Sequence, residues 1–259
     1  MLKKDGIRII DLAIIIGKTL IICDTHIGYE EALNKQGFLI PRFQFKEIIE
    51  RLEKIIKKSG IKKFERIIIN GDIKHEFGRI SEQEWRHTLR LLDFLKKHCK
   101  KVILIKGNHD TILGPIANKR NLKVLEYFIF KKVLIVHGNK LPDKYDKLKK
   151  NIKKIIIGHE HPAVGIRENV RTEIFKCYLF GKFRGKQLIV QPSFNFVSDG
   201  TDVLKEQVLS PFLKGDLGNF KCMVVSDKLY NFGKLANLIK NKKKKTLNSW
   251  SVVGSPAWP

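Results

Sequence analysis

Short apolar runs alternate with amphipathic segments along most of the chain. The runs that predict buried β-strands lie at 18–23, 66–70, 101–105, 131–138 and 153–161. Residues 42–58 and 81–98 carry apolar side chains at helical spacing, and a capping box of Ser81 and Glu84 opens the second helix. A short helix is expected at 142–151. Continuous apolar strands that alternate with helices indicate an α/β fold in which helices cover the sheets.

The pattern changes after about residue 170, where the helical signal weakens. Residues 176–191 predict a hairpin that turns between Gly181 and Gly185, and residues 219–226 predict a further strand. We expect antiparallel strands that complete a second sheet. Residues 1–240 are expected to form a single domain. Residues 241–259 are basic and then contain Trp and Pro, so we expect a tail that is disordered or non-native, or a basic arm that touches nucleic acid.

The composition is strongly basic. Lys and Arg number 51 against 26 Asp and Glu, which gives a net charge of +25. Such an excess favours polyanionic partners such as nucleic acid. The alternative is a proteome that favours charge at high temperature, since the lysines are spread along the whole chain.

Cysteine spacing argues against a disulfide-rich or zinc-motif protein, and hydropathy argues against a membrane-spanning one. The four cysteines, Cys23, Cys99, Cys177 and Cys222, form neither a CxxC zinc motif nor a disulfide framework. No apolar run reaches the roughly 18 residues that a membrane span needs. We therefore expect a soluble, cytoplasmic protein with no membrane partner.

Metal-binding side chains follow each of the five predicted strands. They are Asp24 and His26, then Asp72, then Asn108, His109 and Asp110, then His137, and last His159 and His161. Ligands of an open α/β sheet lie at the carboxyl ends of its strands, so these side chains should meet in one cleft. Any one of these motifs, taken alone, more often has a structural role than a metal-binding role. The ordered set of five makes coincidence a poor explanation and favours a metal site.

The ligand types indicate the metal. Imidazole and carboxylate without thiolate suit manganese most, with iron, zinc or nickel as alternatives, whereas magnesium prefers oxygen. Seven or so ligands exceed what one ion takes, so two divalent ions are expected. Asp72 is the candidate bridge, because a carboxylate can join two ions and a neutral imidazole cannot. Two ions about 3.5–4 Å apart can share a hydroxide as nucleophile, which suits phosphoryl displacement.

The motif order DTH, GD, GNHD, HG, GHEH resembles the calcineurin-like metallophosphoesterase superfamily over about residues 18–162. Within it, the chain is similar to archaeal phosphoesterases related to the SbcD DNA-repair exonucleases. The resemblance implies a four-layer αββα sandwich of two mixed β-sheets flanked by helices. It implies that a first metal is held by Asp24, His26, Asp72 and His161. It implies that a second metal is held by Asp72, Asn108, His137 and His159.

The resemblance also implies roles beside the metals. His109 would stand over the phosphate and protonate the leaving oxygen, and Asp110 would orient His109. The superfamily commonly has Asp at the end of its second motif, where "GDIKH" has His75. His75 would then support His109 or lie on the first turn of a helix. Glu160 is not expected to be a ligand, because side chains alternate along an extended segment and it would point away from His159.

These inferences predict a metal-dependent phosphodiesterase that acts on nucleic acid, nuclease-like and related to DNA repair. Phe38 and Phe43, near the expected rim of the cleft, could stack on bases. One alternative is a phosphodiesterase for small molecules or nucleotides. Another is a non-catalytic metal-binding scaffold for repair proteins, which the complete ligand set disfavours. The segment after His161 looks like sheet completion, so a DNA-facing cap domain is not expected.

Overall fold

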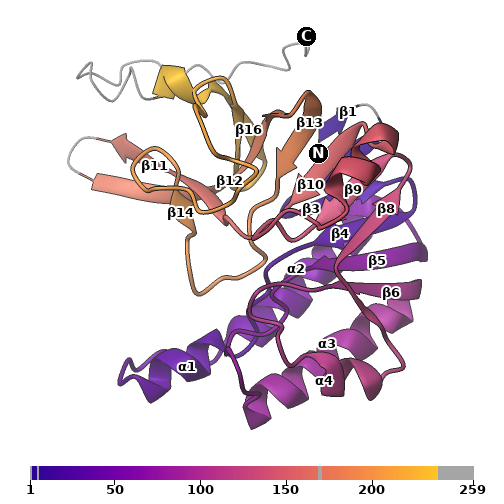
Figure 1. The fold of residues 1–259 in the computed structure, drawn as a ribbon. Helices are drawn as coiled ribbons and strands as arrows, with labels where there is room; N and C mark the ends of the chain where they lie inside the picture. Colours follow the sequence, from indigo (N-terminus) through magenta and orange to yellow (C-terminus); the bar gives the residue numbers. More distant parts are fainter. Residues whose placement is uncertain (1, 5, 169–170, 239–259) are drawn as a thin grey trace.

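Two β-sheets pack against each other at the centre of the computed structural model (Figure 1). The structure describes residues 2–4, 6–168 and 171–238. The predicted tail at 241–259 lies outside the described residues, and the predicted domain limits stay a prediction. No helix among the described residues is both long enough and apolar enough to cross a membrane.

The first sheet contains the N-terminal half of the chain in sequential order. Its strands are β1 (Leu2–Lys4), β2 (Ile7–Ile10), β3 (Ala13–Ile16), β4 (Thr19–Ile22), β5 (Phe64–Asn70), β6 (Cys99–Ile105) and β7 (Val124–Leu125). Strands β1 to β4 pair antiparallel, and β4 to β7 pair parallel. The parallel part places the carboxyl ends of β4, β5 and β6 at one edge.

The second sheet is also mixed. Its strands are β8 (Tyr127–Phe130), β9 (Val133–Val136), β10 (Lys154–Ile157), β11 (Pro162–Glu168), β12 (Arg171–Phe183), β13 (Lys186–Val190), β14 (Thr201–Asp202), β15 (Lys221–Val225) and β16 (Leu229–Lys234). Strands β9, β10 and β13 run parallel, whereas β12 pairs antiparallel with β11, β13 and β15. The long strand β12 therefore joins the parallel centre to the C-terminal hairpins.

Alternating side chains of the second sheet divide between two hydrophobic cores. Ile135 and Ile156 point into the core shared with the first sheet. Their neighbours Leu134, Ile155 and Ile157 point into a second core on the outer face. This is the two-residue period of a strand buried on both faces, and it explains why these runs are apolar without interruption.

Helices flank both sheets, and α1 projects beyond them (Figure 1). They are α1 (Tyr29–Lys35), α2 (Gln44–Ser59), α3 (Glu82–His98), α4 (Gly114–Asn118) and α5 (Tyr145–Leu148), the last continued by a 3-10 turn at Lys149–Asn151. Apolar residues of α2 and α3, such as Leu52 and Leu92, belong to the core of the first sheet. Tyr145 of α5 contributes to the outer core of the second sheet. The predicted sandwich of two mixed sheets flanked by helices is confirmed.

The five strands and the two long helices read from apolar patterning are all present, and the capping box at Ser81 is formed. Several short strands were not predicted, among them β1, β2 and β3. Each of these strands has only three or four residues, and turns at Gly6, Asp11 and Gly17 with positive φ separate them. Runs that short carry no readable period.

Gln191 ties the two sheets together close to their shared edge. Its buried side-chain Nε2 donates to the carbonyl of Leu12, in the turn between β2 and β3, at 2.9 Å and to that of Ile21, in β4, at 3.0 Å. Its backbone N–H donates to Ile157 O of the second sheet at 2.8 Å. One residue thus fixes how the sheets lie relative to each other.

We expect Gln191→Met to lower the free energy of unfolding by about 1–3 kcal/mol, because it leaves two buried carbonyls without their donor while keeping the side-chain volume. Urea unfolding of metal-free protein measures this. The matched control is Gln187→Met at an exposed position, for which a change within about 0.5 kcal/mol is expected. Equal effects of the two substitutions would contradict the bridging role.

Candidate metal centre

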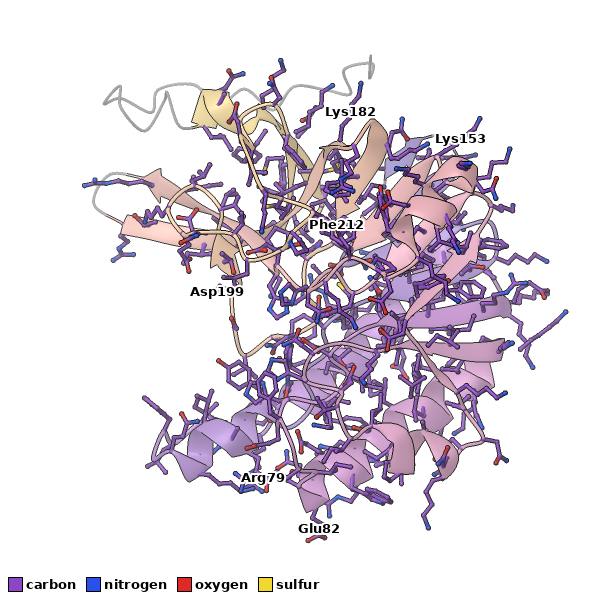
Figure 2. All side chains as sticks on the ribbon, viewed as in Figure 1. Arg79, Glu82, Lys153, Lys182, Asp199 and Phe212 are labelled. Atoms are coloured by element: carbon purple, nitrogen blue, oxygen red, sulfur yellow. The ribbon has the colours of Figure 1, made fainter. Side chains whose placement is uncertain are left out.

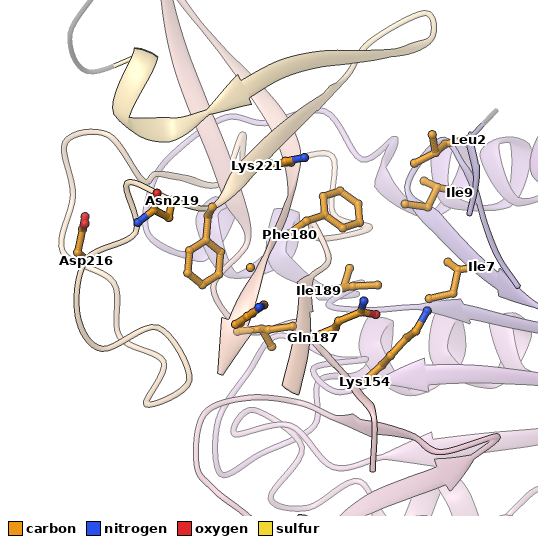
Figure 3. Close-up of a pocket in the computed structure, with 14 residues that line it drawn as sticks. Leu2, Ile7, Ile9, Lys154, Phe180, Gln187, Ile189, Asp216, Asn219 and Lys221 are labelled. Atoms are coloured by element: carbon orange, nitrogen blue, oxygen red, sulfur yellow. The ribbon is translucent and has the colours of Figure 1, made fainter. Parts of the chain in front are cut away.

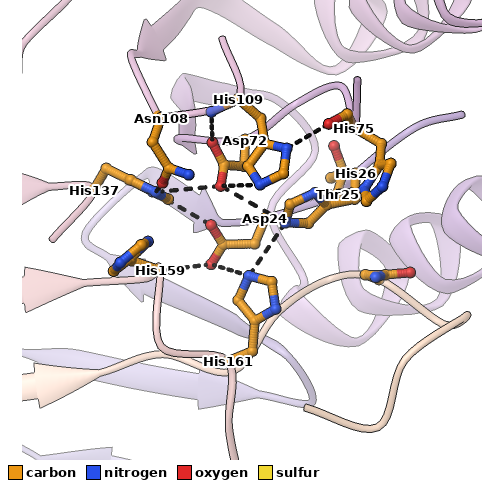
Figure 4. Close-up of polar contacts among 12 residues, drawn as sticks. Asp24, Thr25, His26, Asp72, His75, Asn108, His109, His137, His159 and His161 are labelled. Atoms are coloured by element: carbon orange, nitrogen blue, oxygen red, sulfur yellow. Dashed lines mark hydrogen bonds and ion pairs between the residues drawn. The ribbon is translucent and has the colours of Figure 1, made fainter. Parts of the chain in front are cut away.

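Loops from both sheets meet where the parallel strands end, and Figure 4 shows their side chains converging. The first sheet contributes the loops after its parallel strands β4, β5 and β6, and the second contributes those after β9 and β10. All predicted ligands lie in this cluster, as Figure 4 shows: Asp24, His26, Asp72, Asn108, His137, His159 and His161. The strand-end reasoning therefore placed these residues correctly, while their roles as ligands stay predictions.

The predicted ligands form two groups joined by one carboxylate, and a third group of possible ligand atoms, from His26, His75 and His109, shares His26 with the first. Possible ligand atoms lie within 4.8 Å of one another in the group Asp24, His26 and His161, and likewise in the group Asp72, His137 and His159. Asp72 Oδ2 is 3.3 Å from His137 Nε2 and 3.7 Å from His26 Nε2, so it stands between the groups. Asn108 Oδ1 lies 2.9 Å from His137 Nε2. This grouping has the layout that the family resemblance implied.

Backbone N–H groups hold both carboxylates in place. The N–H of His109 donates to Asp72 Oδ1 at 2.9 Å, which leaves Oδ2 facing the imidazoles. The N–H of His159 donates to Asp24 Oδ2 at 3.0 Å, and Asp24 Oδ1 faces His137 Nδ1 at 3.3 Å. Each carboxylate is therefore oriented by a neighbouring motif. Asp72 presents Oδ2 to the imidazoles, whereas Asp24 presents Oδ1 to His137 and Oδ2 to His161, 3.8 Å from its Nε2.

The backbone that carries these side chains is not extended. Asp24, His26, Asp72, His159 and His161 all have positive φ, between 42° and 63°, and they are half of the non-glycine residues with positive φ in the described ranges. The expectation that strand alternation directs His159 and His161 to one side was therefore wrong in its reason. Left-handed turns, which favour Asn, Asp and His among non-glycine residues, aim these side chains.

Two motif glycines make room for the cluster. A Cβ on Gly107 would collide with Asp72 Oδ1, and a Cβ on Gly71 would collide with the ring of His137. Gly71 also has a φ of 83°. The motifs "GD" and "GNHD" therefore need glycine at these positions, because the side chains of His137 and Asp72 approach the backbone too closely for a Cβ.

Charges in the cluster shift the pKa values in opposite directions. Burial lowers the pKa of His26 well below its usual value, and the nearby His161 lowers it further. Burial also lowers the pKa of His159, to about 4. Burial opposes protonation of His137 too, yet Asp72 and Asp24 raise its pKa to about 9. His137, together with other histidines, holds the pKa of Asp72 below its usual value against the effect of burial.

Two features of the cluster fit bound cations. Among the described residues none donates a hydrogen bond to Asp24 Oδ1, although this oxygen is buried. His26 Nε2 and His161 Nε2 face each other at 3.2 Å, an arrangement that two neutral lone pairs do not favour without a shared proton or cation. Imidazole nitrogens and carboxylate oxygens without thiolate are ligands of divalent transition metals.

His109 lies beside the two groups with one ring nitrogen engaged. Its Nδ1 hydrogen-bonds to His75 O, which leaves Nε2 directed into the site, 4.0 Å from Asp72 Oδ2. The carboxylate of Asp110 does not contact this ring. It accepts from the backbone N–H groups of Gly107 and Ile73, so the expectation that Asp110 orients His109 is corrected: the carbonyl of His75 does so. Burial, followed by Asp72, raises the pKa of Asp110 to about 7.

His75 connects the site to α1. Its Nδ1 lies 3.3 Å from His26 Nδ1, and its ring stacks on Tyr29 with 4.0 Å between ring centroids. A residue that binds metal through Nε2 commonly has its other nitrogen held by a neighbour, and His75 is placed to do this for His26. The His75 side chain thus faces His26, and its carbonyl holds His109.

Gln44, at the first position of α2, supports the first ligand loop and was missed by sequence reasoning. Its buried Nε2 lies 3.1 Å from Thr25 O and 3.0 Å from His26 O. Glu30 in turn accepts from the backbone N–H groups of Phe43 and Gln44, each at 2.7 Å. A glutamine at a helix start has no sequence signal for such a long-range contact.

Glu160 faces away from the metal-binding side chains, as expected. Its buried carboxylate accepts from the backbone N–H groups of Leu209 and Ser210, the shortest at 2.9 Å. Ser210 Oγ donates to Gly138 O at 2.7 Å, one residue after His137. This segment therefore braces both ligand loops of the second sheet.

A hollow at the other end of the sheets lies apart from this chemistry (Figure 3). It has a volume of about 550 Å³ and lies between the sheets, with Ile7, Ile9 and Phe180 among its lining residues. Lys154, the first residue of β10, also lines it, whereas the ligands follow the last residue of β10. None of the predicted site residues lines this hollow.

The sequence and the fold both match known proteins. The family model described as calcineurin-like phosphoesterase matches residues 17–189. No curated protein matches the sequence. Nuclease MPE from Pseudomonas putida has a similar structure, with a TM-score of 0.58 and 18% identity over 86% of this chain and 92% of that chain. The phosphoesterase Yfce from E. coli matches with a TM-score of 0.35 and 18% identity over 79% and 86%.

We expect Glu160→Ala to lower the free energy of unfolding by about 1–3 kcal/mol, because it leaves two backbone N–H groups without their acceptor. Faster amide hydrogen exchange at Leu209 and Ser210 should accompany the loss. Glu53→Ala, on the exposed face of α2, is the control and should change neither quantity. Unchanged exchange at Ser210 in Glu160→Ala would show that the carboxylate does not hold this segment.

Proposed function

Because the chain belongs to the calcineurin-like phosphoesterase family, we propose that it is a two-metal phosphodiesterase that acts on nucleic acid. Hydrolysis of phosphate esters with divalent metals is the chemistry of this family. The observation that carries the proposal is the position of Asp72. Its Oδ2 stands between two groups of imidazole and carboxylate ligands, with Nε2 of His109 4.0 Å away.

Each group would hold one divalent cation, with manganese the expected metal. Asp24, His26 and His161 would hold the first, and Asn108, His137 and His159 the second; Asp72 would touch both. Bound cations would supply Lewis acidity that activates water and neutralises charge on the phosphate oxygens. His137 would lose its proton on metal binding, because a ligating imidazole must be neutral.

His109 would act on the leaving group. The hydrogen bond from Nδ1 to the carbonyl of His75 leaves Nε2 as the nitrogen that reaches the site, so a proton on Nε2 is available to a departing oxygen. Transfer of this proton requires a ring that carries hydrogens on both nitrogens. Asp110 would contribute by fixing the backbone of its own loop.

The charge of the chain supports a nucleic-acid substrate. A net charge of +25 favours a polyanion through release of its counterions. The P. putida protein of similar fold is described as a nuclease. The relation to SbcD, a role in DNA repair and a cytoplasmic location stay predictions.

With Mn²⁺ present, we expect hydrolysis of bis-p-nitrophenyl phosphate, of single-stranded DNA and of RNA, because each offers a diester to the two ligand groups. Release of nitrophenolate and of oligonucleotide fragments measures this. Chelation by EDTA should abolish all three activities, and His109→Ala should lower kcat by about 10²–10⁴-fold.

The outcomes separate the candidate functions. Hydrolysis of a cyclic dinucleotide without cleavage of either polymer would identify a small-molecule phosphodiesterase instead. No hydrolysis of any of these substrates with Mn²⁺, including at elevated temperature, would leave only the metal-binding scaffold.

Metal content tests the division of roles. We expect two Mn²⁺ per chain in the wild type and in His109→Ala, and fewer than two in Asp72→Asn, which removes the shared carboxylate. Elemental analysis after gel filtration measures this, and the melting temperature should rise with Mn²⁺ only where the metal binds. Loss of both ions from His109→Ala would show that His109 is a ligand.

A further inference from the structure

Phe77 places an exposed aromatic ring directly beside His109. The two ring centroids are 3.7 Å apart with an angle of 35° between the planes. The Phe77 side chain is nevertheless 55% exposed, which is unusual for a large apolar residue next to a polar site. One part of the ring is packed on the imidazole, and the rest remains accessible.

The loop that carries Phe77 is firmly anchored. Glu84 of α3 is fully buried, and its Oε1 accepts from the backbone N–H groups of His75 and Glu76 at 3.0 and 2.7 Å. Arg79, two residues beyond Phe77, lies at the outer edge of the molecule near Glu82 (Figure 2). The backbone just before Phe77 is therefore held by α3 before any substrate arrives, and the ring itself is packed on His109.

We propose that Phe77 is the stacking platform for the nucleobase next to the scissile phosphate. The inference rests on the proposed function and extends it to the substrate. The Phe77 ring lies 3.7 Å from the His109 ring. A phosphate that reaches His109 Nε2 would therefore place one of its two neighbouring nucleotides beside Phe77. An exposed aromatic ring at that place binds the face of a base, and it does so without regard to base identity.

Stacking on Phe77 selects the form of the substrate. In a continuous duplex both faces of every base are covered by neighbouring bases, so no face is available to the ring. An unpaired base, or a base at a strand end, offers one. The substrate class is therefore a phosphodiester flanked by an unpaired base, as in single strands and frayed ends.

The test compares short single-stranded oligonucleotides that have one cleavable phosphodiester, the other linkages being methylphosphonates. In two further oligonucleotides a base-free tetrahydrofuran residue replaces the nucleotide on the 5′ or the 3′ side of that phosphate. For the wild type with Mn²⁺, removal of the base on one side should lower kcat/KM by about tenfold, within the range for stacking of one base on an aromatic ring.

Variants assign this preference to Phe77. Phe77→Leu should abolish the difference between the base-bearing and base-free substrates, and Phe77→Tyr should keep it. Ile129→Ala removes an apolar side chain of β8 that is 37% exposed and belongs to neither ligand group, and it should also keep the difference. Metal content should be unchanged in all three.

Two results would overturn the inference. If Phe77→Leu lowers kcat/KM for base-bearing and base-free substrates by the same factor, Phe77 only positions His109. If the wild type cleaves both substrates equally well, no base is bound there, although the proposed function stands. Absence of any cleavage would instead refute the proposed function, and the inference with it.

Discussion

Two buried carboxylates that face imidazoles are the constraint on which the site depends. Asp24 and Asp72 are 0% and 2% exposed, and removing such charges from water costs several kcal/mol each unless positive charge compensates them. His137 supplies one such charge, because both carboxylates stabilise its protonated form. Burial lowers the pKa of His26 and of His159, so these two rings offer lone pairs. The site thus combines negative charge with nitrogen lone pairs. A divalent cation would neutralise the charge and accept the lone pairs.

The same constraint explains why the two sheets must be held in register. Asp24 and Asp72 follow strands of the first sheet, whereas His137 follows a strand of the second. A small slide of one sheet would separate ligand atoms that lie within about 5 Å of one another. Hydrogen bonds between the sheets prevent this near the site. Asn70 Nδ2 donates to Val136 O at 3.0 Å, and Gln191 bridges the other side.

The sequence predicted the fold class and the clustering of the site residues, but not the short strands around them or the long-range contacts. Strand ends are marked by an apolar run followed by polar residues, and the topology of parallel strands then brings those residues together. Short hairpins such as β2 and β3 carry no such period. Contacts that join distant segments, such as Glu160 to Ser210, leave no local trace either. The direction of His159 was expected from strand alternation, yet the structure achieves it through a left-handed turn that no periodicity reveals.

Those left-handed turns bear on how the site is formed. Each costs of order 1 kcal/mol or more for a residue with a Cβ. Hydrogen bonds between the ligand segments offset this cost at His26 and His159, two of the five site residues with positive φ. The N–H of His26 donates to Asp72 O at 2.9 Å, and the N–H of His159 donates to the Asp24 carboxylate. The contacts that hold the strained backbone are thus made by the ligand segments themselves. Metal binding would reinforce this arrangement rather than create it, because the packed sheets already bring the possible ligand atoms within 4.8 Å of one another in each group.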